Sequence, residues 1–138
     1  MFSFESLNHK PYAYYKPADM VELAGGYHVE DGEKVTNPVR LRDLFFQPKE
    51  TKEHPEYGDS IVAVTYDMED EEGYPVAFNL PSAMVADTKN KILSDGPAMS
   101  MIARGQVGII FYEYVSNRDR EKPDEKRERY VGCRWVEL

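Results

Sequence analysis

The sequence has 138 residues, an apolar share of 41% and a formal net charge of −8 at pH 7. This length fits one compact domain, and the apolar runs are too short to cross a bilayer, so we expect no membrane partner. The acidic balance disfavours a protein that coats duplex DNA, although it allows a basic groove on an acidic body. The first twenty residues lack the basic cluster and apolar stretch of a secretory signal, so a cytoplasmic location is expected.

Residues 1–38 are expected to form an N-terminal arm, extended or folded into a short hairpin. The segment is rich in Tyr, Pro and Gly, as in "KPYAYYKPAD" and "EDGEK", and it has no sustained apolar period. Proline removes a backbone donor and glycine favours turns, so this composition does not predict a long helix or strand. The domain itself is predicted to occupy residues 39–138.

Three strands are predicted after the arm. "VRLRDLFF", from residue 39, alternates apolar and charged side chains, and "SIVAVTYD", from residue 60, is rich in β-branched residues. "GYPVAFNLP", from residue 73, places its larger apolar side chains on one face. The acidic "MEDEEG" between the second and third strands predicts a hairpin.

A change of apolar period then predicts a broken helical segment. "PSAMVADTKNKILSDG" has apolar residues at about helical spacing and stops at Gly96, and "PAMSMIARG" begins with a proline and ends at Gly105. "QVGIIFYEYV" and "RYVGCRWVEL" predict two more strands, joined by a charged segment.

The order of these elements predicts a mainly β fold: a five-stranded OB-like Greek-key barrel with a helix between strands 3 and 4, plus the extended N-terminal arm. In that fold the face of strands two and three, with the loops joining strands one to two and four to five, binds oligonucleotides or oligosaccharides. Here those loops are Gln47 to Asp59 and Asn117 to Arg129. The second holds six basic and five acidic residues, which is typical either of a flap over a groove or of a solvated hairpin that maintains solubility.

The sequence lacks the residue patterns of common enzymes and metal sites. His9, His28 and His54 are isolated, and the acidic "DMEDEEG" has Glu72 where a calcium loop needs glycine. No glycine-rich phosphate loop and no serine nucleophile motif is present. We therefore expect no catalysis, no metal and no cofactor. Cys133 is the only cysteine, and its place inside a predicted strand is typical of a small buried thiol.

Tyrosines and basic residues point instead to single-stranded nucleic acid, which is held by aromatic rings that stack on bases and by Lys or Arg along the backbone. If Ile109 and Phe111 face the core, alternation places Tyr112 and Tyr114 on the opposite face. The candidate nucleic-acid-binding residues are Tyr112, Tyr114, Tyr130, Arg134, Arg118, Arg120, Lys122, Lys126, Arg127, Arg129, Arg40, Arg42, Lys49, Lys52 and Tyr57. The tyrosines could instead cover the exterior of the sheet against the helix or the arm.

The strand order, with "VRLRDLFF", "VAFNLPS", "GQVGIIFYEY" and "RYVGCRWVEL", resembles the small OB-fold single-stranded DNA-binding proteins encoded by bacteriophages, over residues 39–138. The resemblance implies non-catalytic binding of single-stranded DNA in phage or bacterial replication or recombination. It also implies a homo-oligomer, with a replication or recombination protein as a further partner.

The alternative function is an acidic protein-binding module, such as a phage-encoded inhibitor or an accessory subunit of a basic host enzyme. Electrostatic complementarity would then speed association with a positively charged partner. The contact would be formed by "VEDGE", residues 29–33, and by the acids of the predicted hairpin, with the tyrosines as interface anchors. The hairpin acids are Asp67, Glu69, Asp70, Glu71 and Glu72.

Overall fold

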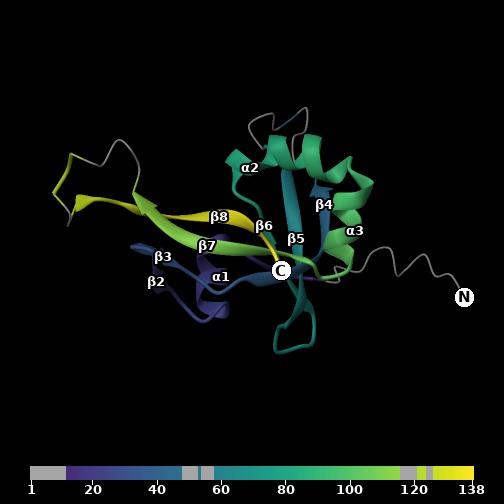
Figure 1. The fold of residues 1–138 in the computed structure, drawn as a ribbon, viewed down its shortest axis with the longest axis horizontal. Helices are drawn as coiled ribbons and strands as arrows, with labels where there is room; N and C mark the ends of the chain where they lie inside the picture. Colours follow the sequence, from purple (N-terminus) through teal and green to yellow (C-terminus); the bar gives the residue numbers. More distant parts are fainter. Residues whose placement is uncertain (1–11, 48–52, 54–57, 116–120, 124–125) are drawn as a thin grey trace, which may run out of the picture.

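The computed structural model describes residues 12–47, 53, 58–115, 121–123 and 126–138, and within them the fold is mainly β (Figure 1). The strands are β1 (Ala13–Tyr15), β2 (His28–Glu30), β3 (Glu33–Val35), β4 (Val39–Gln47), β5 (Ser60–Glu69), β6 (Pro75–Asn79), β7 (Val107–Val115) and β8 (Arg129–Glu137). The helical elements are α1 (Pro17–Leu23), α2 (Ser82–Asp87), the π-helix η2 (Thr88–Leu93) and α3 (Gly96–Ala103).

All five strands predicted for the domain are present, as β4 to β8. The predicted hairpin joins β5 to β6, and the predicted helical segment lies between β6 and β7 as α2, η2 and α3. The end of α3 follows the predicted signal: Gly105 has φ +71, and its N–H donates to the carbonyl of Ile102 at 2.9 Å. The next residue, Gln106, donates to the carbonyl of Met101 at 3.0 Å, which completes a Schellman motif.

The predicted five-stranded OB-like barrel is a point of correction, because the described strands form an open mixed sheet of eight strands. Their order is β1-β6-β5-β4-β7-β3-β2, with β8 paired to the other edge of β7. Closing the five predicted strands would require β8 beside β6, but β6 pairs in parallel with β1, with Ala13 opposite Val76. Helix α1 contacts β6, β7 and β8, and its Met20 is fully buried. The helix therefore packs against both outer strands of the predicted five, β6 and β8.

Residues 12–38 contain more regular structure than an extended arm or a hairpin. Helix α1 starts with Pro17 at its first position, and the backbone N–H of Lys16 donates to the Asp19 carboxylate at 3.2 Å. The predicted hairpin is present as β2 and β3, and its turn is formed by Asp31 (φ 50) and Gly32 (φ 80). The segment adds β1 and β3 to the sheet and Met20 to the core.

The main core lies between the inner face of the sheet and the helices. It joins Leu41 and Ile61 to Ile102 of α3, and Phe78 meets Phe111 with ring centroids 5.2 Å apart. The opposite face of β5 is buried as well, in a smaller cluster where Tyr12 and Phe45 cover neighbouring valines. A strand buried on both faces explains why "IVAV" is an unbroken apolar run.

Thr36 connects the two strands that share one edge of β7. Near its start, β7 pairs with β4 at Val39, and farther along it pairs with β3 at Val35. Between these points the Thr36 N–H donates to the Phe111 carbonyl at 2.9 Å, and the Thr36 hydroxyl accepts from the Phe111 N–H at 3.1 Å. This residue therefore holds the β2–β3 hairpin against β7.

Among the described residues, no helix has the length and apolar character needed to span a membrane.

Candidate nucleic-acid interface

The register of β7 and β8 brings three tyrosines to one face of the sheet. Tyr114 lies opposite Tyr130, and Tyr112 lies opposite Gly132 in this antiparallel pair. Residues directly opposite each other share a face, whereas Phe111 belongs to the other face and is fully buried. We call Tyr112, Tyr114 and Tyr130 the tyrosine stripe.

The rings of the tyrosine stripe contact one another in sequence. The ring centroids of Tyr112 and Tyr114 are 5.9 Å apart, and those of Tyr114 and Tyr130 are 5.6 Å apart. Tyr114 is the most open, with 45% of its surface exposed. Gly132 makes room for Tyr112, because a Cβ at Gly132 would lie 2.3 Å from the Tyr112 ring. The stripe is therefore a continuous aromatic surface with one ring lying across a glycine.

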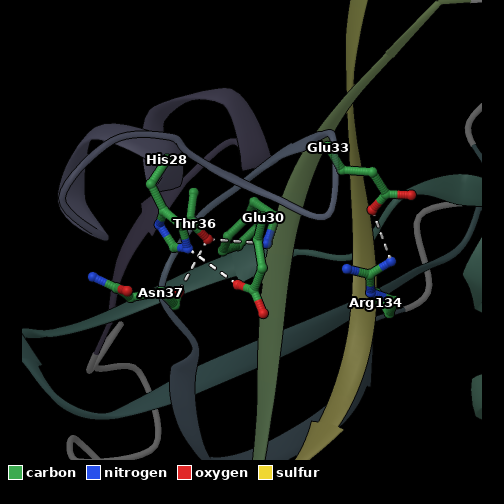
Figure 2. Close-up of polar contacts among 7 residues, drawn as sticks. His28, Glu30, Glu33, Thr36, Asn37 and Arg134 are labelled. Atoms are coloured by element: carbon green, nitrogen blue, oxygen red, sulfur yellow. Dashed lines mark hydrogen bonds and ion pairs between the residues drawn. The ribbon is translucent and has the colours of Figure 1, made fainter.

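Arg134 extends the stripe at its Tyr112 end. Its guanidinium carbon lies 5.6 Å from the centroid of the Tyr112 ring, within reach of a cation–π interaction. The same guanidinium forms an ion pair with Glu33 of β3 at 3.3 Å (Figure 2). Glu30 and Asp31 line a small polar pocket with these two residues. The acidic β2–β3 hairpin thus partly neutralises the cationic end of the stripe.

The sequence analysis did not predict the contact between Glu33 and Arg134. Glu33 and Arg134 are 101 residues apart, and no local pattern joins them. The available signal was the Asp31-Gly32 dipeptide, which is typical of a tight hairpin turn and would have placed Glu30 and Glu33 opposite each other.

The remaining predicted basic residues are spread over the sheet and its loop. Arg40 lies over the Tyr66 ring at 5.7 Å and opposite Gly108, so it shares the outer face but lies four positions along β7 from Tyr112. Arg42 is exposed at a bulge in β4. Arg129 lies opposite Val115 and so faces away from Tyr130. In the described part of the charged segment, Arg127 Nε donates to the Lys122 carbonyl at 2.8 Å, and the Lys126 N–H donates to Pro123.

Five predicted residues lie outside the described ranges: Arg118, Arg120, Lys49, Lys52 and Tyr57.

The acids proposed for protein binding lie at the β5–β6 hairpin. Asp67, Glu69, Glu71 and Glu72 are exposed. Asp70 differs because its carboxylate accepts hydrogen bonds from the backbone N–H groups of Glu72 at 3.0 Å and Tyr74 at 2.8 Å. Asp70 therefore builds the turn, and the other four present their charges to solvent.

The pKa shifts belong to groups outside the tyrosine stripe, and burial is their main cause. Burial raises the pKa of the Cys133 thiol to about 12. It also raises the pKa of Tyr27, with the Glu113 carboxylate as a lesser cause, and that of Tyr14, with Tyr12 as a lesser cause. In the part of the chain that the structure describes, no group of three or more His, Cys, Asp or Glu side chains is placed to hold a metal.

Comparison with known proteins finds no match: no family model fits the chain, and neither the curated proteins nor the solved structures that were searched include a significant relative.

Proposed function

We propose that this protein binds single-stranded nucleic acid, with single-stranded DNA as the ligand, and acts without catalysis in phage or bacterial replication or recombination. The observation that carries the proposal is the tyrosine stripe, a row of contacting rings that ends at Arg134. The strand order β6-β5-β4-β7-β8, with helices between β6 and β7, also supports it. This is the neighbour order of an OB fold left open between its third and fifth strands. A cytoplasmic location, a homo-oligomer and a replication or recombination partner belong to the same proposal.

The stripe would hold bases by stacking. A stacked base contributes about 1 to 3 kcal/mol and needs an open ring face, which Tyr114 offers best. Phosphates would be contacted by Arg134, whose pair with Glu33 joins side chains that are 50% and 58% exposed. An exposed pair of this kind contributes about 0 to 1 kcal/mol, so a phosphate can replace the carboxylate.

Replacing Tyr114 by Ala tests the stripe directly. We expect the affinity for a fluorescein-labelled oligo-dT, measured by fluorescence anisotropy at low salt, to fall roughly 5- to 150-fold, the equivalent of about 1 to 3 kcal/mol. Binding by the unaltered protein should weaken as salt is raised, because phosphate contacts release counterions.

Tyr74→Ala is the matched control, since Tyr74 is 38% exposed and lies on the β5–β6 hairpin instead of the stripe. Equal losses in the two variants would contradict a site at the stripe. If the unaltered protein does not bind oligo-dT at low salt, the proposed function is wrong.

The second candidate function is the acidic protein-binding module. The exposed acidic side chains of the β5–β6 hairpin favour it. Four carboxylates are exposed around one tight turn, which suits a basic surface on a partner. Absence of oligo-dT binding, together with salt-sensitive retention on a basic host enzyme such as a nuclease, would select this function.

A further inference from the structure

A pocket distant from the tyrosine stripe lies between the helical segment and the last residues of β8. Its volume is about 340 Å³, at the lower end of the range of ligand sites. The lining is mostly apolar and consists of Ile92, Ala98, Met101, Ile102, Val107, Trp135, Val136 and Glu137. We call it the β8 pocket. Ile92 comes from the π-helix η2, a conformation that is often found at functional sites.

The pocket adjoins a strand edge that no described strand occupies. β8 pairs with β7 on one edge, and its other edge has no partner strand among the described residues. The N–H of Leu138 donates to the carbonyl of Gln106 at 2.9 Å, which sets the hydrogen-bonding alternation along β8. In an antiparallel ladder every second residue bonds to the same neighbour, so Val136 bonds toward β7. The backbone groups of Trp135 and Glu137 therefore point to the open edge.

Side-chain placement defines what could pair with that edge. Trp135 and Glu137 share one face of β8, and both line the pocket. A strand added at the edge would place one side chain beside Trp135, over the apolar lining, and another two positions away beside Glu137. Glu137 is exposed, and no ion pair is formed with it in the described part of the chain.

We propose that the β8 pocket binds an extended segment of a partner protein by strand addition to β8. The segment carries a large apolar side chain, which fills the pocket, and a Lys or Arg two positions away, which pairs with Glu137. Charge complementarity favours a basic partner over a second copy of this chain, because each copy has a net charge of −8. The site does not depend on the tyrosine stripe or on nucleic acid.

Trp135 supplies the measurement, because it is the only tryptophan in the chain and lines the pocket. The probe is the peptide acetyl-Thr-Lys-Thr-Phe-Thr-Lys-Thr-amide, which has no tryptophan and strong strand propensity. Titrating it into the full chain should change Trp135 emission until saturation. A peptide with Ala in place of Phe should bind at least about tenfold more weakly, since the anchor is lost.

Two variants of the protein locate the site. Ala98→Phe fills the pocket and should weaken peptide binding at least about tenfold, whereas Ala103→Phe, at an exposed position of the same helix, should leave it unchanged. Glu137→Lys, at an exposed position, should reverse the preference toward a peptide with Glu in place of both Lys residues. The charge reversal keeps the test decisive if Ala98→Phe does not fold.

The proposal is overturned if the peptide produces no saturable change, or if neither Ala98→Phe nor Glu137→Lys alters the titration. It is also overturned if Trp135 emission shifts with protein concentration in the absence of peptide, because that result assigns the pocket to a second copy of the chain.

Discussion

At Cys133, burial controls the chemistry of a single side chain. The thiol packs against the core beside β7, and burial raises its pKa from an ordinary value of 9.0 to about 12. Only the thiolate reacts with disulfide reagents, so the folded protein holds the group in its inert form. We predict that Cys133 reacts with a chromogenic disulfide at pH 8 at least about 100-fold more slowly in the folded than in the urea-unfolded protein, as followed by absorbance.

The same shift affects stability at alkaline pH. The unfolded thiol loses its proton near pH 9.0, whereas the folded thiol keeps it to about pH 12, so unfolding becomes easier as pH rises through this window. Below pH 9.0 the contribution to stability is fully present. Cys133→Ala is the control, because it should remove this part of the alkaline loss. Equal thiol reactivity in folded and unfolded protein would show that the side chain is open to solvent.

At the scale of the element, the β7–β8 pair depends on a glycine that makes room for a ring. A Cβ at Gly132 would lie 2.3 Å from the Tyr112 ring, so the ring must move if any side chain is added. We predict that Gly132→Ala lowers the affinity for oligo-dT while the protein stays folded, because the displaced atoms belong to the flexible end of a side chain. Fluorescence anisotropy measures the affinity, and circular dichroism checks that the protein stays folded. Unchanged affinity would show that the position of Tyr112 is not used in binding.

The β2–β3 hairpin is the second element with a testable effect on the stripe. The Glu33 carboxylate forms an ion pair with the Arg134 guanidinium, and a phosphate would have to replace it there. We predict that Glu33→Gln raises the affinity for oligo-dT by up to about fivefold, the equivalent of about 1 kcal/mol for an exposed pair. Glu71→Gln, on the β5–β6 hairpin, removes the same charge at another place and should change affinity less. An equal gain from the control would assign the effect to net charge alone.

At the scale of the whole molecule, the segment before residue 39 contributes to the core. Met20 of α1 is fully buried where the helix meets β6, β7 and β8. We predict that Met20→Ala lowers the free energy of unfolding by about 2 to 5 kcal/mol, measured by urea denaturation. Leu23→Ala, on the same helix with its side chain 45% exposed, should cost much less. Similar costs for both would show that α1 does not stabilise the sheet.

The order and type of the main elements could be predicted from the sequence, because they depend on the spacing of apolar residues over short stretches of the chain. Alternation identified β4 and placed Tyr112 and Tyr114 on one face, and Gly105 marked the end of α3, since each signal spans only a few neighbouring residues. Helix α1 was locally encoded too, by Pro17 and Asp19, but the surrounding Tyr, Pro and Gly obscured it.

The edges of the sheet were decided by the tertiary structure alone. Alternation states which face of a strand is apolar, but every strand has two edges with the same backbone groups, so it cannot state which strand lies beside which. Sequence therefore predicted the five strands of the domain. It did not predict β1 beside β6, the edge of β8 that no described strand occupies, or the contact between Glu33 and Arg134. Those neighbours depend on how α1 and the sheet share one buried volume, and this is a property of the packed chain.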